Sequence, residues 1–167
     1  MEYVYLGILI FIFGLAIFDL IIGVSNDAVN FLNSAVGAKT ASFKVILGLA
    51  AIGVFFGAAT SNGMMDVARH GIFQPQYFTF VEIMCILMAV MVTDVILLDT
   101  FNSLGMPTST TVSLVFELLG GTVALAMIKS IASEGALTFG EMINTDKVLT
   151  VVLGIFLSIA IAFFFGL

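Results

Sequence analysis

Apolar residues fill long unbroken stretches of the chain, and short polar segments separate these stretches. A helix that crosses a bilayer needs about 20 apolar residues, and runs of roughly this length occur about five times. They cover residues 3–24, 43–60, 78–98, 112–128 and 148–167. The polar connections are too short to fold separately. We therefore expect an all-α protein, with residues 1–167 forming a single transmembrane domain of about five transmembrane helices.

Composition supports a membrane location. Hydrophobic residues make up 61% of the chain and charged residues only 10%, whereas about 25% of a soluble domain is charged. Eleven acidic residues against five basic ones give a net charge of −6, which argues against a nucleic-acid partner. The sequence contains no phosphate-binding loop, dinucleotide fingerprint or hydrolase motif. We expect an integral membrane protein of the plasma (inner) membrane, surrounded by the lipid bilayer, that is not an enzyme and needs no cofactor.

A dense polar cluster interrupts the first apolar run at residues 23–34. If the chain is helical there, four side chains share one face: Asp19, Asn26, Asn30 and Asn33. Asp27 lies beside them. Such groups cannot face lipid unpaired, so we expect them to face protein or a water-filled site. Their oxygens suit a hard cation and their amide N–H groups suit an anion. The alternative is a polar loop in which Asn26 or Asp27 caps a helix.

A second polar cluster begins with a glycine and a proline. Gly105 and Pro107 end any helix that arrives from Asp99, and the hydroxyl residues that follow are preferred at helix N-termini. These hydroxyl residues are Thr108, Ser109, Thr110, Thr111 and Ser113. A helix N-terminus attracts an anion, and hydroxyl groups add hydrogen-bond donors. The alternative is a plain cap at the membrane interface. Two such clusters predict broken or re-entrant helices around a substrate site near the membrane midplane.

Three further acids lie within the apolar runs. Glu82 and Asp94 stand near opposite ends of their run, from which each can reach the lipid headgroups, whereas Glu117 lies deeper and is expected to face protein or water. Asp94 and Asp99 also raise the alternative of an intramembrane hydrolase. Five positions apart on a helix, they would point about 140° apart, which disfavours a shared catalytic role.

At the two polar clusters the chain resembles the inorganic phosphate transporter (PiT) family. Each half of such a transporter carries a G-x-N-D-x-x-N element and a later P-x-S-T-T element. Here the first stands at residues 23–30, with one extra residue between Gly23 and Asn26, and the second at residues 107–111. The resemblance extends over essentially the whole chain as one N-terminal half.

This resemblance implies cation-coupled symport of inorganic phosphate by two inverted repeats, of which this chain would be one half. By position in the motifs, Asn26, Asp27 and Asn30 would bind the coupling cation, sodium or a proton. The phosphate ligands would be Asn26, Asn30, Ser109, Thr110 and Thr111. The coupling ion would be sodium or a proton, and we expect no cofactor.

Single copies of both motifs predict that transport needs a missing C-terminal half or a second chain. The last apolar run ends at Leu167 without a charged flank, from which we expect a truncated chain. The alternative is a natively short protein. The alternatives to symport are a passive ion channel subunit and a membrane fragment that does not transport.

Overall fold

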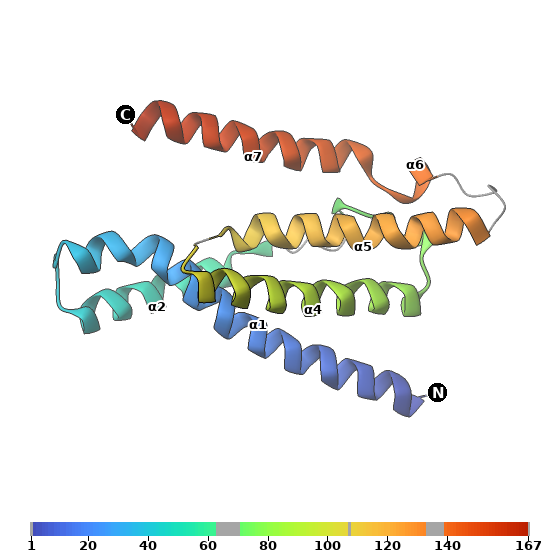
Figure 1. Cartoon of the computed structure of the whole chain (residues 1–167), viewed down its shortest axis with the longest axis horizontal. Helices are drawn as coiled ribbons and strands as arrows, with labels where there is room; N and C mark the ends of the chain where they lie inside the picture. The colour runs from blue at the N-terminus through green and yellow to red at the C-terminus, as the bar shows by residue number, and fades with distance from the viewer. Residues whose placement is uncertain (1, 63–70, 107, 133–138, 167) are drawn as a thin grey trace. The chain divides into compact units, whose positions relative to one another are not determined.

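The computed structural model describes residues 2–62, 71–106, 108–132 and 139–166 (Figure 1). The described residues are almost entirely helical, apart from a single antiparallel bridge between Phe73 and Ile143. The main helices are α1 (Glu2–Gly37), α2 (Phe43–Ala59), α4 (Phe80–Leu104), α5 (Thr110–Ala132) and α7 (Thr145–Gly166). Two short helices, η2 (Pro75–Tyr77) and α6 (Phe139–Met142), lie in the connections. The predicted all-α architecture is confirmed.

Four of these helices are long and apolar enough to cross a membrane: α1, α4, α5 and α7. The expected span at residues 43–60 is present as α2, but at 17 residues it is shorter than a typical membrane crossing. The prediction of about five spans therefore becomes four spans and one shorter apolar helix. The length and apolar composition of these four helices are those of an integral membrane protein.

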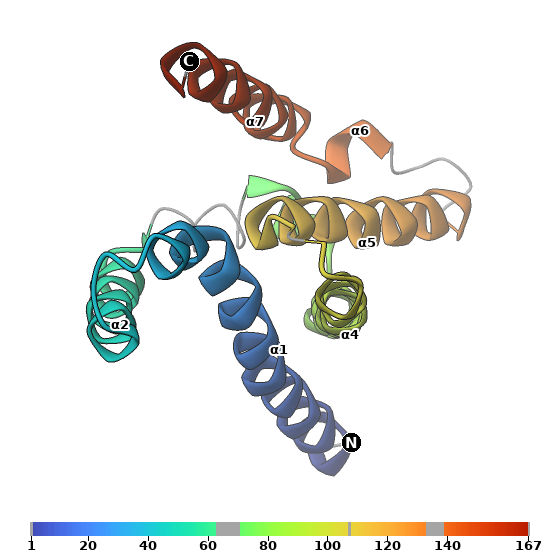
Figure 2. The ribbon, with the colours of Figure 1, turned by 60° about the vertical axis from the view of Figure 1, so that its left-hand side comes forward.

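The predicted break at the first polar cluster is wrong, because α1 continues through it as one helix of 36 residues. Asn26 and Asp27 consequently lie inside a helix and cap none. The helix bends rather than breaks, as Figure 2 shows by the change in direction along α1. The Ser25 hydroxyl donates to the carbonyl oxygen of Ile21 at 2.8 Å, and a serine bonded back to the preceding turn is a known cause of helix bending. Gly23, two positions earlier, adds a second residue that favours a bend.

The predicted interruption at the second polar cluster is confirmed. Helix α4 ends at Leu104 and α5 begins at Thr110. Gly105 has a φ of +67°, a conformation that glycine adopts without steric cost, and the amide of Met106 donates to the carbonyl of Phe101 at 3.0 Å. This turn closes α4 within one residue of its end. Pro107, to which the sequence assigned part of the break, lies outside the described residues.

The chain divides into two compact units. The first contains residues 1–65 and 91–113, and so holds α1, α2, the second part of α4 and the turn that leads into α5. The second contains residues 66–90 and 114–167. Both polar clusters of the sequence fall in the first unit.

A buried apolar cluster lies in the second unit. It comprises Ile72, Phe73, Phe78, Ile86, Val90, Val115, Leu118, Ala126 and Met142. A Cβ atom on Gly121 would lie 3.3 Å from Cγ2 of Ile86, so the glycine lets α5 approach the first part of α4 closely. The first part of α4 lies beside α5 in Figure 1. Close apolar packing therefore holds this unit together.

One ion pair reinforces the second unit. The ammonium of Lys129 lies 2.9 Å from Oε2 of Glu82, donates to the carbonyl oxygen of Tyr77 at 2.7 Å and stands 5.4 Å above the ring of Phe78. Glu82 also accepts from the amide and hydroxyl of Thr79, which forms a capping box at the start of α4. The Glu82 carboxylate therefore binds two protein residues, Thr79 and Lys129.

Candidate functional site

Polar side chains from three segments of the first unit meet at residues 26–30, in the C-terminal half of α1. The segments are α1 itself, the last turn of α4, and the turn that opens α5. Asn26 of α1 is the most buried of the group, at 1% exposure, and Asp27 is partly buried. Because an unpaired amide at this depth would be costly, the bonding partners of Asn26 define the site.

Asn26 uses both ends of its amide. Its Nδ2 donates to Oδ1 of Asn102 on α4 at 2.9 Å. Its Oδ1 accepts from the backbone amide of Thr108 at 3.4 Å and from Nδ2 of Asn30 at 3.5 Å. Asn30 also donates from Nδ2 to the carbonyl oxygen of Thr108 at 3.2 Å. This network joins α1 to α4 and to the turn before α5.

Asp27 faces the start of α5. The hydroxyl of Thr110 lies 3.4 Å from Oδ1 and 3.3 Å from Oδ2 of Asp27, and donates toward the carboxylate. Beside this pair is a hollow of about 350 Å³. Its lining residues are Asp27, Asn30, Phe31, Thr108, Ser109, Thr110 and Thr111. The hollow therefore has a carboxylate and an amide on one wall and a row of hydroxyl groups on the other.

The opposite wall of the hollow is the N-terminus of α5. Ser109 caps this helix, since its Oγ accepts from the amide of Val112 at 3.4 Å and its carbonyl oxygen accepts from the amide of Ser113 at 3.0 Å. The first amides of a helix lack partners within the helix and carry the positive end of its dipole. Over a span as long as α5, this end attracts an anion.

Gly23 lets α1 come close to α4 and α5. A Cβ atom added there would lie 3.8 Å from Cγ2 of Thr110 and 3.9 Å from Cδ1 of Leu98, which is ordinary van der Waals contact. There is thus room for a methyl group on Gly23 and for little more.

We expect Gly23→Ala to be tolerated, with a stability change within about 1 kcal/mol, because alanine fits and favours the helix. Gly23→Leu should destabilise the unit by about 1–3 kcal/mol, since its outer atoms would overlap Thr110 and Leu98. Thermal unfolding of the two variants in the same detergent measures the difference. Equal melting temperatures for the alanine and leucine variants would contradict the close approach.

The Asp94 side chain is buried inside the first unit and does not extend toward the lipid headgroups. It is only 4% exposed, and its Oδ1 accepts from the hydroxyl of Ser113 at 3.0 Å. The carboxyl of Asp19 on α1 is its neighbour. The interpretation of Asp94 as a headgroup-facing side chain is therefore wrong. Asp99 is exposed on the same helix, so the two acids of the hydrolase alternative do not come together.

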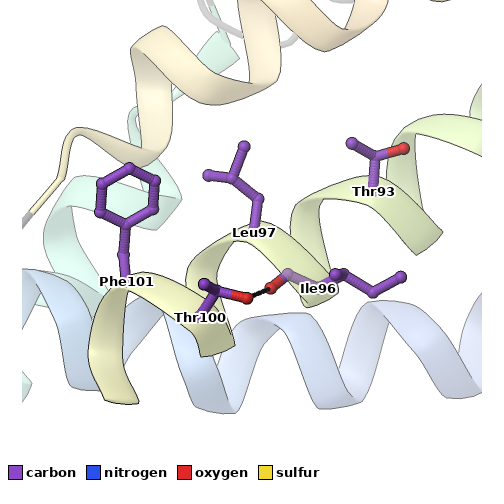
Figure 3. Close-up of a pocket in the computed structure, with 5 residues that line it drawn as sticks. All are labelled: Thr93, Ile96, Leu97, Thr100 and Phe101. Carbon is purple, nitrogen blue, oxygen red and sulfur yellow. Dashed lines mark hydrogen bonds between the residues drawn. The ribbon is translucent and has the colours of Figure 1, made fainter. Parts of the chain in front are cut away.

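The described part of the first unit also contains two hollows with other linings. One, of about 340 Å³, lies along a single helix, α4, and Figure 3 shows its lining: Thr93, Ile96, Leu97, Thr100 and Phe101. The hydroxyl of Thr100 donates to the carbonyl oxygen of Ile96 at 2.6 Å, so it is used within the helix. The other is an apolar groove of about 750 Å³ between α1 and α2, in whose wall Asp27 is the charged residue. Neither offers a set of converging polar groups.

The structure brings together most of the side chains that the sequence nominated. Asp27, Asn30, Ser109, Thr110 and Thr111 all line the hollow of about 350 Å³. Asn26 lies behind that lining and holds it through hydrogen bonds. Asn33 is exposed and lies outside the lining, although it was expected on the same face.

Two contributors escaped the sequence analysis. Asn102 and the backbone of Thr108 complete the network around Asn26. An amide in the last turn of an otherwise apolar span, three residues before Gly105, was the available signal for Asn102.

Comparison with known proteins identifies the family of the chain. The model of the phosphate transporter family matches residues 23–167, which include both polar clusters and every residue that lines the hollow. No curated protein and no solved structure matches the chain. Because the family match covers most of the sequence, the chain belongs to the phosphate transporter family.

Proposed function

We propose that this protein carries inorganic phosphate across the plasma membrane together with a cation, sodium or a proton, as a transporter and not as an enzyme. The observation that carries the proposal is the contact between Thr110 and Asp27. It places an anion-attracting helix N-terminus and a carboxylate in the wall of one hollow.

In this proposal each wall of the hollow binds a different ion. Hydroxyl groups of Ser109, Thr110 and Thr111, with the first amides of α5, donate to phosphate oxygens. The Asp27 carboxylate and amide oxygens of α1 hold the cation. Asn26, nominated as a ligand of both ions, contributes in this proposal by fixing the position of Asn30 and of the turn at Thr108.

Placing opposite charges side by side couples their binding. A bound cation lowers the cost of bringing phosphate near Asp27, and phosphate does the same for the cation. This mutual stabilisation is reciprocal by thermodynamic necessity. It is the physical basis for expecting symport rather than independent movement of the two ions.

The test is uptake of radiolabelled phosphate by proteoliposomes with an inward sodium gradient, an inward proton gradient or no gradient. Symport predicts accumulation above the external phosphate concentration under one of the gradients, and loss of that accumulation when an ionophore collapses it. Phosphate entry that only equilibrates, whatever the gradient, would identify a passive channel and overturn the proposal.

We further propose that two halves are needed for transport, the other being a missing C-terminal half or a second copy of this chain. The sequence has one copy of each motif. The resemblance to phosphate transporters, in which each half carries both motifs, implies a second half. We expect coupled uptake to rise with the fraction of chains that crosslink as pairs. Full coupled uptake in vesicles whose protein is entirely monomeric by crosslinking would contradict this.

A further inference from the structure

Asn102 lies at the α4 end of the amide network and bonds α1 through both ends of its side chain. It lies in the last turn of α4, and its Nδ2 donates to the carbonyl oxygen of Ile22 on α1 at 3.4 Å. Its Oδ1 is thereby turned toward Asn26 and accepts from Nδ2 of Asn26 at 2.9 Å. This bond is the shortest in the network. Together with the backbone amide of Thr108, which donates to Oδ1 of Asn26 at 3.4 Å, it fixes which end of the Asn26 amide faces α4.

The orientation passes from Asn26 to Asn30. With Nδ2 directed at Asn102, Asn26 turns its Oδ1 to the amide of Thr108 and to Nδ2 of Asn30. Asn30 is held with its N–H₂ group inward by two acceptors, Oδ1 of Asn26 at 3.5 Å and the carbonyl oxygen of Thr108 at 3.2 Å. The oxygen of the Asn30 amide is the end left for the hollow that Asn30 lines.

The result is an acceptor surface. The Asn30 oxygen stands one helical turn from the Asp27 carboxylate, and both residues line the same hollow. Two such oxygens attract a cation and would repel a phosphate oxygen. If the amide of Asn30 were reversed, its N–H₂ group would face the hollow and weaken cation binding.

We propose that Asn102 is a positioning residue that acts through Asn26 to present the Asn30 oxygen, together with Asp27, to the coupling cation. This inference rests on the proposed function and adds to it a residue that sets cation affinity without touching either ion. Asn102 should influence phosphate only through the cation.

Three variants test the inference. Asn102→Leu has a similar size but removes the acceptor for Asn26, and Asn102→Asp keeps an acceptor oxygen. Ser103→Ala, at the next and exposed position of α4, is the matched control. The reconstituted full chain is titrated with sodium while bound radiolabelled phosphate is measured, and phosphate is titrated separately at saturating sodium.

Loss of one hydrogen bond of this kind corresponds to about a tenfold change in an equilibrium constant. We expect Asn102→Leu to raise the half-saturating sodium concentration about tenfold, while phosphate affinity at saturating sodium stays within about twofold. Ser103→Ala should stay within about threefold of the wild type for sodium. Asn102→Asp, which keeps the acceptor for Asn26 but loses the donor to Ile22, should raise the half-saturating sodium concentration by less than Asn102→Leu does.

Equal effects of Asn102→Leu and Asn102→Asp, or an unchanged sodium response in Asn102→Leu, would overturn the role of Asn102. A wild-type protein that binds phosphate without any response to sodium would overturn the presentation of Asn30 to that ion. Absence of phosphate binding by the wild type at any sodium concentration would refute the proposed function itself, so the failures are distinguishable.

Discussion

Asp27→Asn should abolish cation-driven phosphate uptake. The substitution keeps the shape of the side chain and an oxygen that can accept from the Thr110 hydroxyl, but removes the negative charge from the hollow. A hydrogen bond or ligand contact to a charged group is worth about 1.5–3 kcal/mol, so cation affinity should fall about ten- to a hundredfold or more. Uptake against increasing sodium or proton concentration measures the change.

The matched control for Asp27→Asn is Asp99→Asn. Asp99 is an exposed carboxylate on α4 outside the lining of the hollow, so its removal changes the net charge equally without touching the site. We expect uptake by this control to resemble that of the wild type. An unchanged cation dependence in Asp27→Asn would remove Asp27 from the cation site.

Thr110→Val should weaken phosphate binding by about ten- to a hundredfold. Valine preserves the branched shape that packs against Gly23 and removes only the hydroxyl group. A hydroxyl can rotate from Asp27 to a phosphate oxygen, and each donation to a charged oxygen contributes about 1.5–3 kcal/mol. Calorimetric titration with phosphate gives the affinity, and a melting curve on the same preparation gives the stability.

Thr100→Val is the matched control for Thr110→Val, because it removes a hydroxyl group outside the proposed phosphate site. The hydroxyl of Thr100 is exposed on α4 and donates to its own helix, so its loss tests the general effect of this substitution on a helix. If Thr110 served only the start of α5, Thr110→Val would lower stability by about 1 kcal/mol and leave phosphate affinity unchanged. That outcome would leave the phosphate assignment without support from Thr110.

The helices were predictable because long apolar runs have one stable solution in a bilayer. A segment such as residues 148–167 must satisfy its backbone hydrogen bonds internally, and α7 does so over Thr145–Gly166. The end of α4 was equally predictable, because Gly105 adopts a positive φ that other residues avoid. In both cases local chemistry alone decides the outcome.

The course of the chain through residues 23–34 was not predictable in this way. Asparagine and aspartate favour turns and caps when considered locally, which indicated a break. In the structure Asn26 is paired with Asn102, and this pairing removes the reason for α1 to end there. The partner is 76 positions away, so local propensity could not reveal it.

The candidate site was predicted in its residues but not in its arrangement. The sequence nominated side chains of both clusters, and the structure shows that Asp27 and Thr110 meet while Asn26 lies behind them. That difference depends on which face of α1 contacts α4. The sequence pattern alone leaves the facing side of α4, and therefore Asn102, unspecified.

The most direct measurement is calorimetric titration of the reconstituted wild-type protein with inorganic phosphate. The titration is performed in sodium chloride and in choline chloride, each at two pH values. A hollow that holds phosphate beside a cation at Asp27 predicts phosphate binding that one cation, sodium or the proton, tightens at least several-fold. No phosphate binding under any of these conditions, or the same affinity in all of them, would contradict a coupled phosphate site.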